Sequence, residues 1–188
     1  MRDECAARGF IYSARTLEEY SLAVLCKIME VTMSLLQGKT ALIFGVANDH
    51  SIAWGIAKTF HENGAHIGIS YAAGALEKRV RPLADSLGCS FVEPCDVSRD
   101  EEIERVAQRA AQEFGQIDIL FNNAGIVTKG TADTTSEEVW QDTLNINVTA
   151  VWHMCKLVIP HMKKQGKGVI VNNGSDWSVV AGKNGAVL

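Results

Sequence analysis

Short apolar runs alternate with longer amphipathic stretches from Leu36 to the end of the chain. The first run, Thr40–Phe44, ends directly at a glycine, and the later runs also stop at or near glycine, asparagine or aspartate. Such runs, bounded by turn-forming residues, are typical of buried strands. They predict strands at Thr40–Phe44, His66–Tyr71, Ser90–Pro94, Ile117–Phe121 and Gly168–Asn173.

The stretches between these runs carry the end signals of helices. Asn63-Gly64 and Gly88 are C-terminal caps, and Ser98–Glu101 and Thr135–Glu138 have the spacing of a capping box. Pro82 is an awkward residue for a helix interior because it lacks an N–H donor. The predicted helices are Ser51–Asn63, Ala75–Leu87, Ser98–Phe114 and a long helix from Thr135 towards Lys164.

Regular alternation of strands and helices predicts the α/β class, with a parallel sheet covered by helices on both faces. Right-handed crossovers give a Rossmann-type doubly wound sheet of order 3-2-1-4-5, with a ligand above the carboxyl ends of strands 1 and 4. We expect residues 35–188 to form this domain, incomplete on its C-terminal side. Residues 1–34 are expected to be an extension, a short helix or a poorly ordered tail, and Met33 is a candidate natural start that N-terminal sequencing would test.

Composition and charge exclude several classes of protein. The net charge of −4 gives no broad basic surface, so we expect no nucleic-acid or anionic-membrane partner. No run is long and uncharged enough to span a bilayer, and the start Met-Arg-Asp-Glu lacks a secretion signal. The five cysteines form no Cys-x-x-Cys pair and the histidines lack metal-ligand spacing, which favours a cytoplasmic protein with reduced thiols and no metal.

The turn after the first strand is the strongest candidate for a binding site. Gly45 permits a tight turn, and Ser51 then begins a helix whose free N–H groups and positive dipole end favour an anion. The spacing differs from Gly-x-Gly-x-x-Gly, so an ordinary strand-to-helix turn is the alternative. Asp96 after the third strand and the small residues of Asn122–Gly125 after the fourth favour a dinucleotide site, because they follow strands at the same edge.

Particular motifs here resemble a known family. Asn122-Asn-Ala-Gly125, Asn145-Ile-Asn-Val148 and Gly168–Ser175 resemble the short-chain dehydrogenase/reductase family. The first half of the domain resembles the enoyl-acyl carrier protein reductases, a divergent branch of that superfamily. That second resemblance rests on Gly45–Gly55, Ala75–Ala84 and Pro94–Val97.

The resemblance implies a nicotinamide cofactor and assigns residues to it. Gly45, Ser51, Ile52 and Gly55 are implied to hold the pyrophosphate; Asp96 and Val97 the adenine; and Asn123, Ala124 and Gly125 the nicotinamide ribose region. Ser70–Ala73, at the end of the second strand, offers neither the carboxylate typical of NAD sites nor the arginine or lysine typical of NADP sites. NAD is therefore weakly favoured over NADP.

The resemblance also implies catalytic positions. Asn147 matches the family's asparagine, which supports a water relay, and Ser175 matches the serine that orients the substrate carbonyl. The alternatives are a helix residue that bonds its neighbours and a loop cap. The family's catalytic tyrosine and lysine would fall at or beyond Leu188, so we expect the chain to be an N-terminal fragment.

Three functions remain open at this stage. The leading interpretation is an NAD(P)-dependent short-chain oxidoreductase that transfers a hydride between its cofactor and a carbonyl or alcohol substrate. The second is an enoyl-acyl carrier protein reductase, and the third is a non-catalytic dinucleotide-binding fragment. The resemblance implies a small-molecule substrate and, for a full-length parent, a homodimer or homotetramer.

We expect the purified 188-residue chain to show negligible turnover, because a positioned general acid contributes typically about 10²–10⁴-fold to the rate. Absorbance of NADH and NADPH in the presence of carbonyl and enoyl substrates measures this. Robust oxidation of either cofactor would contradict it.

Overall fold

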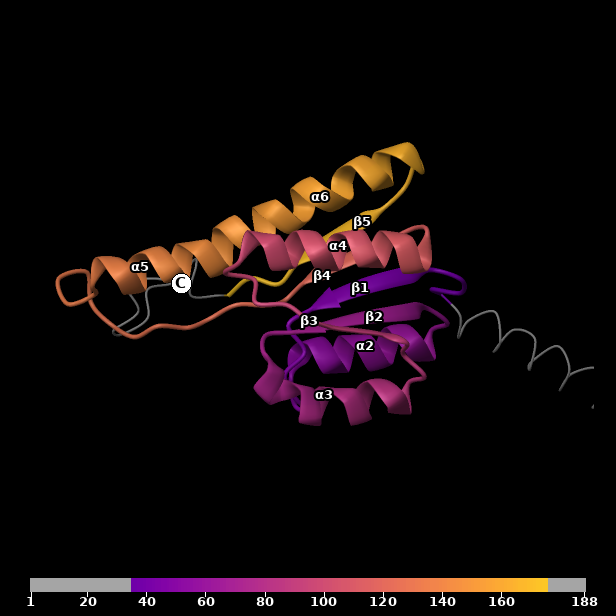
Figure 1. Cartoon of the computed structure of the whole chain (residues 1–188), viewed down its shortest axis with the longest axis horizontal. Helices are drawn as coiled ribbons and strands as arrows, with labels where there is room; N and C mark the ends of the chain where they lie inside the picture. Colours follow the sequence, from indigo (N-terminus) through magenta and orange to yellow (C-terminus); the bar gives the residue numbers. More distant parts are fainter. Residues whose placement is uncertain (1–34, 176–188) are drawn as a thin grey trace, which may run out of the picture. The chain divides into compact units, whose positions relative to one another are not determined.

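The computed structural model describes residues 35–175, and within them a parallel five-stranded sheet has the order β3-β2-β1-β4-β5 (Figure 1). This is the predicted order. The predicted extension over residues 1–34 and the candidate start at Met33 lie outside the described residues. The strands are β1 (Thr40–Phe44), β2 (His66–Tyr71), β3 (Phe91–Pro94), β4 (Ile119–Asn122) and β5 (Val169–Asn172).

Helices cover both faces of the sheet (Figure 1). Along β1, Ala41 and Ile43 join the apolar core under α2 and α3, whereas Leu42 and Phe44 join the core under α4 and α6. This alternation follows from the two-residue period of a strand, and it explains why β1 is buried along its whole length. The helices are α2 (Ile52–Glu62), α3 (Gly74–Ser86), α4 (Asp100–Phe114), α5 (Glu137–Leu144) and α6 (Ala150–Lys164).

The predicted capping box at Ser98–Glu101 is wrong. Helix α4 begins at Asp100 after Arg99, and no side chain caps its first turn. Ser98 instead donates from Oγ and from its backbone N–H to Oδ1 of Asp96, at 2.7 and 3.0 Å. A carboxylate two residues upstream thus offers Ser98 a local acceptor, and a turn forms where the pattern indicated a helix start.

The second predicted capping box is displaced by one residue. Ser136 is the N-cap of α5 and its Oγ accepts from the Val139 N–H at 3.3 Å, while the Thr135 hydroxyl donates to the Thr131 carbonyl at 2.8 Å. The predicted long helix is also interrupted, because a π-helical turn, η1 (Asn145–Thr149), separates α5 from α6. By contrast, α3 continues through Pro82.

Asp118 joins three strands at the amino-terminal edge of the sheet. Its Oδ2 accepts from the Thr40 N–H and from Gln116 Nε2, both at 3.0 Å. Its Oδ1 lies 3.3 Å from Lys167 Nζ and 3.7 Å from Lys39 Nζ. The carboxylate is 5 % exposed, so it depends on these partners in place of water.

The protonation of Asp118 therefore depends on folding. Burial alone would raise the pKa of this carboxyl, but the Thr40 N–H and the ammonium groups of Lys167 and Lys39 outweigh burial and hold the pKa below its ordinary value. A depressed folded pKa means that the stabilisation is complete above the unfolded pKa of about 3.9. It is lost as the pH falls through the folded value.

We expect Asp118→Asn, which keeps the side-chain size and removes the charge, to lower the free energy of unfolding by about 2 kcal/mol at neutral pH. The difference from wild type should shrink as the pH falls below about 4. Urea unfolding at neutral and acid pH measures both effects. Asp85→Asn, at an exposed position on α3, is the control. A difference that stays the same at both pH values would contradict the role assigned to the charge.

Candidate cofactor-binding and catalytic site

A cavity of about 240 Å³ lies at the carboxyl ends of the strands. Its position is the point where the strand order reverses, because β1 pairs with β2 on one side and with β4 on the other. In open α/β sheets this crevice is where ligands bind. The lining comes from the segments after β1, β2, β3 and β4 and from η1: Gly45–Ala47, Ala72, Leu76, Asp96, Val97, Asn123–Ile126 and Ile146.

Gly45 is required by the geometry of this crevice. It has φ +88°, and a Cβ there would lie 2.7 Å from both the N and the Cα of Ala124. The backbone N–H groups of Gly45 and Val46 donate to the Ser70 carbonyl at 3.1 and 3.0 Å. The turn after β1 is therefore held against the ends of both neighbouring strands, and only glycine fits this approach.

Ser51 is the N-cap of α2, as predicted, but its side chain does not cap the helix. Its Oγ donates to the Asn48 carbonyl at 2.7 Å and accepts from the Ala47 N–H at 3.4 Å, so it shapes the loop that leads from Gly45. The N–H groups of Trp54 and Gly55 donate to the Ser51 carbonyl and form the first turn of α2. The N–H of Ile52, the first residue of the helix, has no carbonyl one turn earlier within the helix, so it is open to an anion.

Three of the residues predicted to hold pyrophosphate lie beyond the cavity lining, which ends at Ala47 on this side. They are Ser51, Ile52 and Gly55. Gly55 is exposed in α2, and a Cβ there would meet nothing within 4 Å, so the protein's own packing does not require a glycine. Asp96 and Val97, by contrast, both line the cavity, Val97 as a buried wall and Asp96 as an exposed carboxylate.

Asp96 is held in a defined orientation. Its Oδ1 accepts the two hydrogen bonds from Ser98, and its backbone N–H donates to Glu102 Oε2 at 2.8 Å. Within residues 35–175, its second oxygen accepts no hydrogen bond, so it is the atom open to a ligand donor such as the adenine amino group.

Asn147 is the central residue of the π-helical turn η1. Its Oδ1 accepts from the Ile126 N–H and its Nδ2 donates to the Ile126 carbonyl, both at 2.9 Å. The side chain is therefore committed to the loop after β4. The amide thus fixes this loop through Ile126, and its role in a water relay stays a prediction. Short π-helical segments occur frequently at functional sites, and here the π-helical turn places the Asn147 side chain against the loop after β4.

Two asparagines at the end of β5, Asn172 and Asn173, were not predicted as site residues from the sequence. Asn122 Nδ2 donates to Asn172 Oδ1, and Asn173 Nδ2 donates to Asn123 Oδ1, both at 2.8 Å. The signal was the same Asn-Asn dipeptide at the ends of two neighbouring parallel strands, which topology brings level. Ser175 is exposed two residues beyond Asn173, at the same edge of the sheet.

The cysteines of the described part do not offer a nucleophile. Cys89, Cys95 and Cys155 form no disulfide. Burial raises the pKa of the Cys89 thiol to about 11 and that of Cys95 to about 12, so both remain protonated at neutral pH. Cys5 and Cys26 lie outside the described residues.

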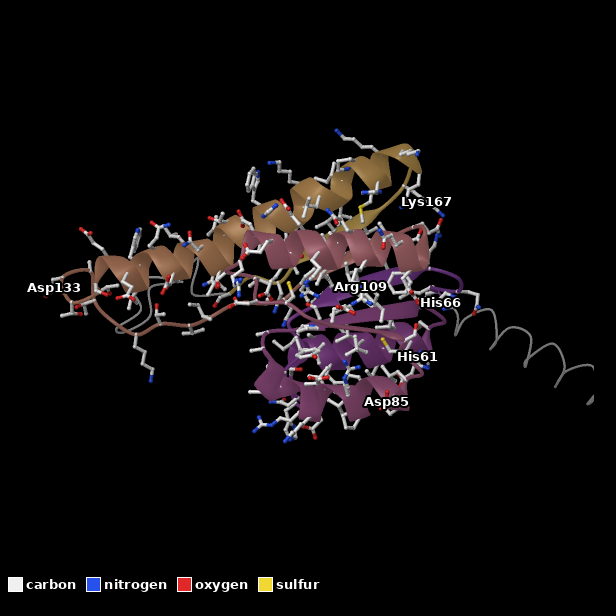
Figure 2. All side chains as sticks on the ribbon, in the orientation of Figure 1. His61, His66, Asp85, Arg109, Asp133 and Lys167 are labelled. Carbon is white, nitrogen blue, oxygen red and sulfur yellow. The ribbon has the colours of Figure 1, made fainter. Side chains whose placement is uncertain are left out.

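A larger cavity of about 480 Å³ lies at the opposite edge of the sheet and is lined in part by His61 and His66. Figure 2 shows both histidines at the amino ends of the strands, on the side away from Asp133. No group of three metal-ligating side chains occurs among residues 35–175. Ligands of doubly wound sheets bind at the carboxyl ends, so the smaller crevice is the better candidate.

No helix in the described part is long and apolar enough to cross a bilayer.

Comparisons with known proteins identify the family that the chain resembles. The model of a family described as enoyl-(acyl carrier protein) reductase matches residues 45–188. An enoyl-[acyl-carrier-protein] reductase [NADH] of Aquifex aeolicus is 37% identical over 142 residues, which are 73% of this chain and 53% of the relative. The chain thus spans about half the length of the curated relatives it matches.

Solved structures give the same similarity. The crystal structure of the Aquifex aeolicus enoyl reductase (NADH) has a TM-score of 0.74 at 36% identity, over 80% of this chain and 61% of that one. An enoyl reductase from Anaplasma phagocytophilum, solved in complex with NAD, has a TM-score of 0.69 at 33% identity, over 74% of this chain and 54% of that one.

Gly45→Ala tests the close approach of β1 and β4. Gly88 is the matched control because it also has a positive φ, +62°, but a Cβ there would meet nothing within 4 Å. We expect Gly88→Ala to cost about 1 kcal/mol of stability, from backbone strain alone. Gly45→Ala should cost about 2 kcal/mol more, because its methyl group overpacks against Ala124. Equal losses of unfolding free energy in the two variants would mean that the turn after β1 shifts to accommodate the methyl group, and would contradict the close approach of β1 and β4.

Proposed function

The chain belongs to the enoyl-(acyl carrier protein) reductase family of short-chain dehydrogenases/reductases, and from this we propose that the protein uses NADH to reduce the carbon–carbon double bond of an enoyl thioester. Among the three functions that the sequence left open, this is the second. The family model extends through residues 45–188, so it includes the second half of the domain, whose motifs favoured a carbonyl substrate. The match of this family model to both halves of the domain supports an enoyl substrate over a carbonyl or alcohol substrate.

One observation carries the cofactor part of this proposal. Gly45 and Ala124 bring the backbones after β1 and β4 into contact at the point where the strand order reverses. A side chain at position 45 would clash with the Ala124 backbone, whereas the bare backbone of these two turns lets a dinucleotide lie close to the chain. The lining of Asp96, Val97 and Leu76 beside it supports an adenine site.

The preference for NADH is supported by the ion pair that Arg81 makes beside the end of β2. Arg81 hydrogen-bonds to Tyr71, the last residue of β2, and its Nε lies 2.5 Å from Glu77 Oε1. A guanidinium that already has a carboxylate partner is poorly placed to neutralise the extra phosphate of NADPH. The relatives from Aquifex aeolicus and Rickettsia conorii are named for NADH, in agreement.

Tyr71 is unsuited to be the proton donor of the reaction. It is 1 % exposed at the end of β2, and burial raises its pKa above the ordinary value, although a hydrogen bond with Arg81 acts in the opposite direction. A group that substrate cannot reach has no part in the proton transfer. This agrees with a site in which the reacting groups lie nearer β4 and β5.

The described residues would position the reactants. Bound NADH would supply the hydride, whose addition to the double bond leaves negative charge on the thioester carbonyl oxygen as an enolate. That oxygen needs a hydrogen-bond donor, and we assign this role to the Ser175 hydroxyl, at the edge where β5 ends. Asn147 would hold Ile126, and with it the loop that borders the cofactor.

Titration of the chain with NADH and NADPH, followed by nicotinamide fluorescence, tests the cofactor assignment. We expect NADH to bind at least about tenfold more tightly. Tighter binding of NADPH would contradict the argument from Arg81 and Glu77.

The substrate class is tested with the full-length protein, supplied with crotonyl thioesters or ketones. We expect NADH oxidation with the thioesters, whereas turnover of ketones alone would restore the carbonyl interpretation. Saturable NADH binding without any turnover would support the third alternative, a non-catalytic binding module.

A further inference from the structure

Two asparagine pairs bridge the carboxyl ends of β4 and β5, and they differ in burial. Asn122 is 2 % exposed and donates to Asn172, which is exposed. In the next pair Asn173 is exposed and Asn123 is half-buried. Both bonds are 2.8 Å long, so geometry does not distinguish the pairs. Their surroundings do, because both residues of the Asn173–Asn123 pair are at least partly open to competing water, whereas the donor of the Asn122–Asn172 pair is buried.

The Asn173–Asn123 pair holds one end of a loop segment that other residues hold at its middle and its far end. Asn123 begins the stretch Asn123–Ile126, which lines the crevice. At the far end of this stretch the Asn147 amide holds both backbone polar groups of Ile126. Between these ends, Ala124 lies against Gly45. The four-residue segment is therefore fixed at its start from β5, in its middle from β1 and at its end from η1.

Of these three restraints, the hydrogen bond from the Asn173 side chain is the one that comes from the end of β5. The backbone N–H of Asn173 also donates to the Asn122 carbonyl at 2.9 Å, which continues the hydrogen bonds between β4 and β5 beyond their last paired residues. Ser175 follows two residues later. The same side chain thus links the segment that borders the cofactor crevice to the segment that carries the candidate catalytic hydroxyl.

We propose that Asn173 is a positioning residue, which acts through Asn123 to hold the loop after β4 in the shape that accepts the dinucleotide. The inference rests on the proposed NADH site and adds to it a residue outside the cavity lining. An exposed amide pair contributes little to folding, but it restricts a binding loop before the ligand arrives, and such preorganisation raises affinity. The Asn122–Asn172 pair, whose donor Asn122 is buried, serves stability instead.

A double-mutant cycle tests this in the 188-residue chain. The variants are Asn173→Ala, Asn123→Ala and the double variant, with Asn172→Ala as the matched control on the neighbouring rung. NADH fluorescence gives the dissociation constant and urea unfolding gives the stability. We expect Asn173→Ala to weaken NADH binding by about five- to tenfold, with little change in stability. The double variant should bind no more weakly than Asn123→Ala alone. Asn172→Ala should lower stability and leave the affinity nearly unchanged.

Amide hydrogen exchange of the cofactor-free chain provides a second readout. Exchange over residues 123–126 should rise in Asn173→Ala, while Asn172→Ala should leave exchange in that segment closer to wild type. Additive losses of affinity in the cycle, or a loss of stability without a loss of affinity, would overturn the positioning role. A wild-type chain that binds no NADH would contradict the proposed function and the cofactor role of Asn173. Unchanged exchange over residues 123–126 would refute the restraint itself, whatever the cofactor result.

Discussion

The contact between the backbones at Gly45 and Ala124 is the constraint on which the carboxyl edge of the domain depends. A Cβ at position 45 would lie 2.7 Å from two backbone atoms of Ala124, which is closer than packed atoms approach. The contact brings the turns after β1 and β4 together where the strand order reverses. The Ser70 carbonyl then ties the same turn to β2. The crevice is therefore a product of backbone geometry, and the side chains around it add selectivity.

The two edges of the sheet have different chemistry. At the amino edge, Asp118 collects two N–H donors and two ammonium groups around one buried carboxylate, an arrangement that joins β1, β4 and β5. At the carboxyl edge, neutral amides make the equivalent connections, from Asn147 to Ile126 and from Asn173 to Asn123. Amides restrain a loop without adding charge, so they leave the crevice free to accept the negative pyrophosphate of a dinucleotide.

The strands and their order were predictable because they depend on local signals. Buried runs such as Thr40–Phe44 leave little choice of structure, and Gly45 marks the tight turn at its end. The helix starts at Ser98 and Thr135 were predicted less well, because Asp96 and Thr131 compete for the hydroxyls that a capping box would use. The four-residue spacing that defines a capping box takes no account of these two competing acceptors. Element boundaries elsewhere moved by only one or two residues, as helix and strand ends commonly do.

The asparagine contacts were harder to predict because their partners are distant in sequence. Asn147 bonds to Ile126, twenty-one residues away, and Asn173 bonds to Asn123, fifty residues away. Neither the π-helical turn nor the amide pair has a signature within a short window of sequence. The resemblance to a family located Asn147 and implies a role in a water relay, whereas the hydrogen bonds of its amide to the loop after β4 are seen only in the folded chain.

A crystal structure of the chain with bound NADH would locate the cofactor without depending on turnover. We expect the dinucleotide to lie across the carboxyl ends of β1 and β4. Its adenine should lie beside Asp96 and Val97, its pyrophosphate over the turn between Gly45 and Ile52, and its nicotinamide along Ala124 and Gly125. NADH in the cavity near His61 and His66, or a crevice that stays empty at saturating NADH, would contradict it.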